Sequence, residues 1–329
     1  MMKPLSNKTN TKEKPEKKLA RNDQVIWWLV LSLFLISIAV SSIIWTWPKI
    51  EKIEAQNNNL IQAPTTSPQK IIFEDLQVEA KSFIIYDPQT EKIIFGKDTE
   101  TARPLASLTK VMTALTAYKL VSLQDTVVII DENALAEDGE SGFRPYSVWR
   151  LKNLLDLTLM SSSNDGAKAI ANTVSAISAK DFISEMNREA LDLGLASTNF
   201  FNATGLDLPS GGAGAYGSPK DVAKLFAYLI QNHPDLLSAT RLNNLVGTSL
   251  ENDRYYASNT NILANEIPGL VASKTGYTQT AGGNLAVVAN LGLNRPIIFV
   301  VMGSSQTGRF HDMKKLINKT QDYLAQMNI

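Results

Sequence analysis

Alternating and helical patterns of apolar residues divide the chain after residue 75 into strands at both ends and helices between them. Residues 81–86 and 92–95 are rich in Ile, Phe and Lys and flank a turn-forming Asp-Pro sequence, so they predict two paired strands. Residues 284–291 and 296–302 predict a second strand pair. Helical spacing recurs at residues 107–121, 147–160, 165 onward, 182–193, 219 onward and 309–327. This order predicts an α/β protein of the α+β kind, with one antiparallel sheet flanked by helices.

A different apolar pattern occupies residues 25–47. This segment holds no charged residue, is long enough to cross a bilayer as one helix, and carries tryptophans near both ends. Residues 1–24 contain seven Lys and Arg against three Asp and Glu, which favours a cytoplasmic tail and an extracytoplasmic chain beyond the segment. A cleaved signal peptide is the alternative, because Ala39-Val40-Ser41 resembles a cleavage site, but signal peptides usually have a shorter apolar region. We therefore expect a single uncleaved transmembrane anchor.

Composition limits the remaining chemistry. The net charge is zero, which gives no argument for a nucleic-acid partner. The chain has no cysteine, and its two histidines, His233 and His311, fall in predicted structural positions, which argues against a zinc site; we expect no metal or other cofactor. Residues 48–75 combine Asn, Pro, Thr and Ser clusters that cannot bury a core, so they predict a linker. Residues 76–329 then form one globular domain.

Three short polar motifs in this domain carry the candidate chemistry: Ser107–Lys110, Ser162–Asn164 and Lys274–Gly276. Together they supply a nucleophilic hydroxyl, a base, a proton relay and an anion-binding lysine, which are the parts of a serine acyl-transfer site. Ser67–Lys70 repeats the first pattern in the predicted linker, and Ser197–Asn199 repeats the second. The inference of an acyl-transfer site therefore rests on the order of the three motifs and on the predicted elements around them.

The first motif can activate a serine. Ser107 and Lys110 are three residues apart at the start of a predicted helix that is apolar over much of its circumference, so their side chains share one face. Burial disfavours the charged form of a lysine and lowers its pKa, which would make Lys110 a base for Ser107. The structural alternative is a serine helix cap followed by a surface lysine, which is the commoner meaning of this spacing.

The other two motifs suit a peptide substrate. Ser162 lies between two predicted helices, where its hydroxyl can pass a proton to a leaving amine, and Asn164 can bind a peptide group or hold Lys110. Lys274 and the hydroxyl of Thr275 can hold a carboxylate, and the glycine that follows lets a substrate lie close to the backbone. A polar turn and an exposed edge-strand lysine are the structural alternatives.

A glycine-rich segment, residues 212–217, matches the dinucleotide-binding pattern Gly-x-Gly-x-x-Gly. That fingerprint requires a strand directly before it, and Pro209-Ser210-Gly211 does not form one. We expect a loop leading into a helix that is capped by Ser218, and no nucleotide site.

As a set, the motifs resemble those of the low-molecular-mass penicillin-binding proteins, the D-alanyl-D-alanine carboxypeptidase family. The resemblance runs from about residue 76 to the C-terminus and is carried by Leu105–Lys110, Ser162–Asp165, Asn202–Asp207, Lys274–Thr278 with Ala281-Gly282, and Arg309-Phe310. It implies the β-lactamase/transpeptidase-like fold, an antiparallel sheet with helices plus a helical subdomain. It also implies a catalytic domain outside the bacterial cytoplasmic membrane, anchored by the predicted N-terminal helix.

The resemblance implies a role for each candidate residue. Ser107 is expected to be acylated by the penultimate D-alanine of a peptidoglycan stem pentapeptide, with Lys110 as base and Ser162 relaying the proton to the leaving D-alanine. The residues expected to bind substrate are Asn164, Lys274, Thr275, Gly276 and Tyr277. The backbone N–H groups of Ser107 and Tyr277 are expected to form the oxyanion hole. β-Lactam antibiotics are expected to be covalent inhibitors.

Related activities use the same residues. A D,D-endopeptidase acting on cross-linked peptides is not separable from a carboxypeptidase by these motifs. A class A β-lactamase would need a glutamate between the second and third motifs, whereas residues 191–219 contain only Asp192 and Asp207 as acids. A non-catalytic wall-binding scaffold usually lacks a nucleophile or base, and both are present here.

Two departures from the family pattern are visible. Many relatives continue into a β-rich domain and a C-terminal anchoring helix, whereas this sequence ends after its last predicted helix, so attachment is expected at the N-terminal side. Leu105 stands where relatives often have proline.

Overall fold

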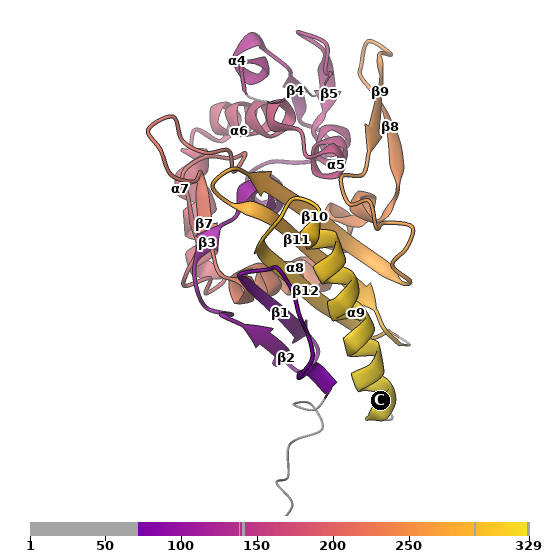
Figure 1. Ribbon diagram of the computed structural model, residues 1–329. Helices are drawn as coiled ribbons and strands as arrows, with labels where there is room; N and C mark the ends of the chain where they lie inside the picture. Colours follow the sequence, from indigo (N-terminus) through magenta and orange to yellow (C-terminus); the bar gives the residue numbers. More distant parts are fainter. Residues whose placement is uncertain (1–71, 138, 140–141, 293, 328–329) are drawn as a thin grey trace, which may run out of the picture. The chain divides into compact units, whose positions relative to one another are not determined.

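The computed structural model describes residues 72–137, 139, 142–292 and 294–327 (Figure 1). The predicted transmembrane segment and most of the predicted linker lie outside these residues. Within the described ranges, none of the helices is both long enough and apolar enough to cross a membrane. Ile72 and Phe73 are buried, and Phe73 stacks on Phe95, so the packed part of the chain begins no later than residue 72.

A five-stranded antiparallel sheet, ordered β10-β11-β12-β1-β2, joins the two ends of the described chain. Its strands are β1 (Ser82–Asp87), β2 (Lys92–Lys97), β10 (Leu270–Thr278), β11 (Gly282–Asn290) and β12 (Pro296–Ser304). Strand β1 pairs with β12, from Ser82 opposite Met302 to Tyr86 opposite Ile298. The two predicted strand pairs and the antiparallel sheet are confirmed.

Strand β10 was missed by the sequence analysis. The apolar pattern predicts strands at residues 284–291 and 296–302 but none at Lys274–Gly276, and this motif lies inside β10, the edge strand of the sheet. Residues Ala272–Gly276 are all buried although most of them are polar. A buried strand with polar side chains lacks the apolar alternation from which strands are predicted.

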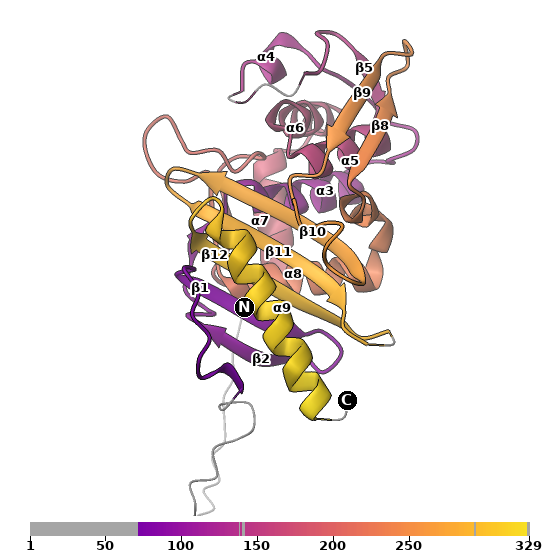
Figure 2. The same cartoon turned by 45° about the vertical axis from the view of Figure 1, so that its right-hand side comes forward.

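Both faces of the sheet are covered by helices, which explains the nearly continuous apolar runs in its strands. Ile84 and Val300 face the helical part of the molecule, whereas their neighbours Ile85 and Val301 face the C-terminal helix. Figure 2 shows α9 (Gly308–Gln326) in front of the sheet and α8 (Pro219–Asn232) behind it.

Five further helices of the described residues form the predicted helical subdomain: α3 (Thr109–Leu120), α4 (Glu132–Leu135), α5 (Leu151–Ser161), α6 (Asn164–Ser178) and α7 (Phe182–Asp192). Figure 1 shows α4, α5 and α6 above the sheet. The helix predicted from residue 147 begins only at Leu151, because Val148–Arg150 forms strand β5 with β4 (Val127–Ile129). Asp181 caps α7, and Ser218 caps α8 as predicted.

Short elements complete the domain. They are strands β3 (Arg103–Pro104), β6 (Asn199–Phe200), β7 (Ala215–Gly217), β8 (Asn244–Thr248) and β9 (Arg254–Ser258), and 3₁₀ turns η1 (Ala106–Leu108), η2 (Pro234–Leu236) and η3 (Ser238–Arg241). Strand β7 pairs with both β3 and β6, so the end of the predicted glycine-rich loop is a strand. Strands β8 and β9 form a hairpin that packs on α5.

Candidate active site

Ser107 and Lys110 meet where η1 turns into α3. The Nζ atom of Lys110 lies 2.9 Å from the Oγ atom of Ser107. Only 1% of Lys110 is exposed, which rules out the surface lysine of the structural alternative. The side chain of Ser107 caps neither η1 nor α3. The two groups are therefore arranged for proton transfer between them.

Two further oxygens fix the amine of Lys110. Its Nζ atom lies 2.7 Å from the Oδ1 atom of Asn164 and 2.7 Å from the carbonyl oxygen of Thr204. A neutral amine has two N–H groups and one lone pair. If the N–H groups donate to Asn164 and Thr204, the lone pair points to the hydroxyl of Ser107. The contacts thus suit an unprotonated lysine that accepts the proton of Ser107.

The electrostatic environment of Lys110 supports the same state. Burial lowers the pKa of Lys110 to about 7, although the carboxylates of Glu137 and Asp165 act in the opposite direction. A base with a pKa near the ambient pH is available in its neutral form and still accepts a proton readily. The pKa of Lys110 is thus lowered by burial, as the sequence predicts.

The stretch Asn202–Asp207, which the sequence singled out without assigning a role, positions the carbonyl of Thr204. The Oδ1 atom of Asn202 accepts hydrogen bonds from the backbone N–H groups of Thr204 and Gly205. Gly205 has a φ of +79°, and a Cβ atom there would lie 1.9 Å from the carbonyl oxygen of Ala106. Only glycine fits this turn, which presses directly on the residue before Ser107.

Ser162 faces the other lysine of the site. It ends α5 in a left-handed conformation, with a φ of +61°, while Ser163 caps the following helix α6. This sharp turn directs the Oγ atom of Ser162 to within 2.8 Å of the Nζ atom of Lys274. Ser162 therefore lies in a polar turn between two helices, as the structural alternative predicts, and this turn also places its hydroxyl in the site.

Lys274 is buried in β10 rather than exposed on it. Its Nζ atom also donates to the carbonyl oxygen of Thr275, at 2.9 Å. Burial lowers the pKa of Lys274 well below its ordinary value, and repulsion from Lys110 in its protonated form and from Arg309 adds to this effect. In its charged form, Lys274 together with Arg309 makes this part of the site positive, which is suited to a carboxylate.

The free edge of β10 passes beside Ser107. The backbone N–H of Ser273 donates to the Oγ1 atom of Thr240, outside the sheet. Because N–H groups alternate along a strand, the N–H of Tyr277 points to this same edge. A Cβ atom on Gly276 would lie 3.1 Å from the backbone nitrogen of Ser107. The close approach that Gly276 allows brings the backbone of Ser107 next to the strand segment that carries the N–H of Tyr277, as the expected pair of oxyanion donors requires.

Three side chains that the sequence analysis did not single out as site residues hold this arrangement together. The hydroxyl of Thr260 lies 2.6 Å from that of Thr275. The buried carboxamide of Asn284 donates to the carbonyl oxygens of Pro104 and Leu105, and so fixes η1 to the sheet. Thr240 covers the first half of β10 through its bonds to Ser273. These residues have ordinary polar side chains and no local motif, so no sequence signal identified them.

The rear of the site is supported by Arg309 and Asp207. The Nη1 atom of Arg309 donates to the carbonyl oxygen of Gly276 at 2.7 Å. Asp207 accepts a hydrogen bond from the hydroxyl of Thr278 at 2.9 Å, and so ties the Asn202–Asp207 turn to the end of β10. Both residues lie in stretches that carried the family resemblance.

The repeats of the first two motifs and the glycine-rich segment do not contribute side chains to the candidate site among the described residues. The backbone N–H of Ser197 and the hydroxyl of Thr198 donate to Asp221, which anchors the loop to α8. Ser67–Lys70 lies outside the described residues. In the glycine-rich segment, a Cβ atom on Gly214 would lie 2.1 Å from the carbonyl oxygen of Leu206, so this loop packs against the turn that holds Thr204.

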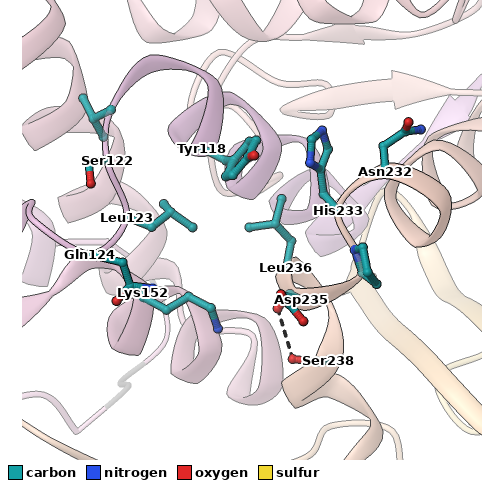
Figure 3. A pocket seen from close by; sticks show the side chains of 12 residues that line it. Tyr118, Ser122, Leu123, Gln124, Lys152, Asn232, His233, Asp235, Leu236 and Ser238 are labelled. Carbon is teal, nitrogen blue, oxygen red and sulfur yellow. Dashed lines mark hydrogen bonds between the residues drawn. The ribbon is translucent and has the colours of Figure 1, made fainter.

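A cavity of about 650 Å³ lies at the opposite end of α3 from Ser107 (Figure 3). Tyr118 and His233 line it, with ring centroids 4.5 Å apart. The twelve residues of α3 span roughly 18 Å at the usual rise per residue, so this cavity is separate from the motifs. His233 packs against aromatic rings there, in keeping with its predicted structural position.

The profile of the D-alanyl-D-alanine carboxypeptidase family matches residues 65–306, and the chain belongs to this family. It is 30% identical over 229 residues to D-alanyl-D-alanine carboxypeptidase DacB2 of Mycobacterium tuberculosis, covering 70% of this chain and 77% of the relative. It is 30% identical over 215 residues to a D-alanyl-D-alanine endopeptidase of Haemophilus influenzae, covering 64% of this chain and 70% of the relative. Longer relatives also match; the chain covers 60% of Escherichia coli DacA.

The solved structure of penicillin-binding protein D2 from Listeria monocytogenes, in its cefotaxime-bound form, has the same fold. It superposes with a TM-score of 0.64 at 27% identity, covering 74% of this chain and 98% of the Listeria chain. The fold is thus penicillin-binding-protein-like and transpeptidase-like, as the resemblance implied.

Proposed function

We propose that the chain is a membrane-anchored serine D,D-carboxypeptidase that removes the terminal D-alanine from peptidoglycan stem pentapeptides. The observation that carries this proposal is the contact of Ser107 with a buried Lys110 whose other two hydrogen bonds are already assigned to Asn164 and Thr204. Family membership supplies the substrate class.

In the first half of the proposed reaction, the Oγ atom of Ser107 attacks the carbonyl carbon of the penultimate D-alanine and gives its proton to Lys110. Negative charge develops on the carbonyl oxygen, where the backbone N–H groups of Ser107 and Tyr277 stabilise it. The C–N bond then breaks, and the proton returns to the leaving amine through the hydroxyl of Ser162. An acyl-enzyme on Ser107 and free D-alanine result.

Substrate binding uses the positive end of the same site. Lys274 and the hydroxyl of Thr275 hold the terminal carboxylate, and Asn164 binds the peptide group while it orients Lys110. Gly276 leaves room for an extended peptide along the free edge of β10. In the second half, water attacks the acyl carbon, with Lys110 again as base, and releases the shortened peptide.

Slow deacylation of β-lactam adducts follows from the surroundings of Ser107. The two acids that residues 191–219 contain are both engaged: Asp207 with Thr278, and Asp192 with Arg188. Neither is placed as the glutamate base of a class A β-lactamase. The Listeria protein has been solved with bound ampicillin and cefotaxime. We therefore propose β-lactams as long-lived covalent inhibitors of this chain rather than rapidly hydrolysed substrates.

A D,D-endopeptidase is the second candidate, favoured by the similarity to the Haemophilus influenzae endopeptidase. The same residues would cleave a cross-link if the leaving amine belonged to a second stem peptide.

The proposed location rests on the sequence alone. We propose residues 1–24 as a cytoplasmic tail, residues 25–47 as the anchor in the bacterial cytoplasmic membrane, and the predicted linker from residue 48 as the tether. The extracytoplasmic catalytic domain then begins at or before Ile72, a few residues earlier than the predicted boundary at residue 76, because Ile72 and Phe73 are buried. Lys-rich and apolar segments in this order support it.

The decisive assay incubates the purified protein with a pentapeptide muropeptide and with a cross-linked dimer, and identifies products by mass. Release of D-alanine that is lost in Ser107→Ala supports the carboxypeptidase, and cleavage of the dimer supports the endopeptidase. Release of neither product would contradict both.

A further inference from the structure

A cavity of about 220 Å³, lined by both polar and apolar side chains, lies at the turn that carries Thr204. Its other lining residues come from the segment after α4, helix α6 and the start of α7. Its polar lining includes Glu137, Lys168, Asn172, Asp181, Asn202 and Thr204. Because the carbonyl of Thr204 also accepts the hydrogen bond of Lys110, this cavity and the candidate base share a wall.

Two of the lining residues, Glu137 and Lys168, form an ion pair. The Oε1 atom of Glu137 lies 3.0 Å from the Nζ atom of Lys168, and their side chains are only 23% and 34% exposed. Lys168 lies one helical turn after Asn164 on α6, so the two share a face. The pair therefore shares a cavity with Thr204, and Lys168 is one turn away from Asn164; these are the two residues whose oxygens fix Lys110.

The charges of this pair do not act equally on Lys110. The carboxylate of Glu137 raises the pKa of Lys110 against the effect of burial, and Asp165 adds to it. Lys274, from the opposite side of the site, is coupled to Lys110 by repulsion. The charged groups around Lys110 are thus Glu137 from the segment after α4, Asp165 and Lys168 from α6, and Lys274 from β10.

We propose that Glu137 and Lys168 are positioning residues that set the protonation of the catalytic base: Glu137 stabilises the ammonium form of Lys110, and Lys168 limits that stabilisation by neutralising Glu137. The inference rests on the proposed function in taking Lys110 as the base of Ser107. Neither residue contacts the substrate, and both act through Lys110. The pair keeps the pKa of Lys110 near neutral pH. A much lower pKa would make Lys110 a weaker base for Ser107.

The test measures the second-order rate constant of acylation by a fluorescent penicillin between pH 5 and pH 9. In Glu137→Gln the rising limb should move to lower pH, because the ammonium form loses a stabilising charge. In Lys168→Gln the limb should move to higher pH, because Glu137 is left unpaired. Partial exposure screens both effects, so each shift should be roughly 0.3–1 pH unit and should shrink at high salt. The limb of the double variant should lie between those of the two single variants.

Matched controls come from the ion pair of Lys152 with Asp156 on α5, whose side chains are 21% and 19% exposed and whose lysine lines the separate cavity at the opposite end of α3. Lys152→Gln and Asp156→Asn should leave the profile unchanged, and Lys168→Arg should restore it. If Glu137→Gln does not fold, the upward shift in Lys168→Gln and its reversal in Lys168→Arg still test the proposal. Unshifted limbs, or shifts in the same direction for both single variants, would overturn it. A wild-type protein that is not acylated at all would instead contradict the proposed function.

Discussion

The Nζ atom of Lys110 lies 2.7 Å from the carbonyl oxygen of Thr204, a residue 94 positions later in the chain. A backbone carbonyl accepts a hydrogen bond but cannot give a proton away. It therefore holds the amine of Lys110 without competing for its role as a base. The turn that presents this carbonyl also touches Ala106, the residue before the nucleophile, so one loop supports both reacting groups.

Replacing Gly205 with alanine should damage the site more than the fold. The new Cβ atom would lie 1.9 Å from the carbonyl oxygen of Ala106, at a φ of +79°. The backbone strain alone costs about 1–3 kcal/mol of stability, and a displacement of Ser107 by about 1 Å reduces the rate by roughly 100-fold. Penicillin acylation kinetics and thermal denaturation measure the two effects.

Gly194→Ala is the control for this substitution. Gly194 also has a positive φ, +64°, but a Cβ atom there would meet nothing within 4 Å. The Gly194→Ala variant should lose some stability and keep full acylation activity. Equal acylation rates in Gly205→Ala and Gly194→Ala would contradict the role given to the turn.

Acylation should depend on pH through both buried lysines. Since burial lowers the pKa of Lys110 to about 7, the amine is neutral above that pH and protonated below it. The acylation rate constant should therefore rise about tenfold per pH unit below pH 7 and level off above it. Lys274 must stay charged to hold a carboxylate, and its lowered pKa should give a decline on the alkaline side, below pH 10.5. A flat profile between pH 5 and pH 8 would be incompatible with Lys110 as the base.

Thr260 should matter for recognition of the terminal carboxylate. Its hydroxyl lies 2.6 Å from that of Thr275 and so orients it. Thr260→Val should lower kcat/KM for a pentapeptide by roughly fivefold to tenfold, the effect of about 1 kcal/mol for one hydrogen bond. Thr260→Ser keeps the hydroxyl and should retain activity. The prediction fails if the valine variant loses as much activity on a peptide whose terminal carboxylate is replaced by an amide.

Asn284 should be needed for stability. It is fully buried, and its carboxamide bonds to Pro104, Leu105 and the backbone N–H of Gly303. Asn284→Ala leaves these backbone groups without partners in an apolar setting, which should lower the free energy of unfolding by about 2–4 kcal/mol. Urea denaturation followed by circular dichroism measures this loss. An unchanged midpoint would show that the clamp between η1 and the sheet is dispensable.

The parts of the fold that follow apolar periodicity could be predicted from the sequence. Strands β1, β2, β11 and β12 and most long helices were expected near their observed positions, because each buries a regular set of apolar side chains. Strand β10 was missed because its buried residues are Ser273, Lys274 and Thr275, which tertiary contacts satisfy. The hairpin β8–β9 was missed because its outward face carries exposed Val246 and Tyr256 beside polar residues.

Some groups of the candidate site could be predicted from the sequence, and others could not. Side chains that do chemistry, such as those of Ser107, Lys110 and Lys274, are visible as motifs, and the contacts of Lys110 with Ser107 and Asn164 follow the expectation. The carbonyl of Thr204 could not be predicted, since every residue has one and only the turn fixes its direction. Thr260 reaches Thr275 across the chain, and no local pattern marks such a contact.

Acylation of Ser107 is the step on which the proposed mechanism depends. Residues 70–329 should be incubated with benzylpenicillin, digested, and analysed by peptide mass mapping, beside a Ser107→Ala variant whose thermal denaturation is unchanged. We expect one penicilloyl adduct, on the peptide that contains Ser107, and no adduct in the variant. An adduct on another serine, such as Ser162 or Ser197, or labelling that survives Ser107→Ala, would contradict it.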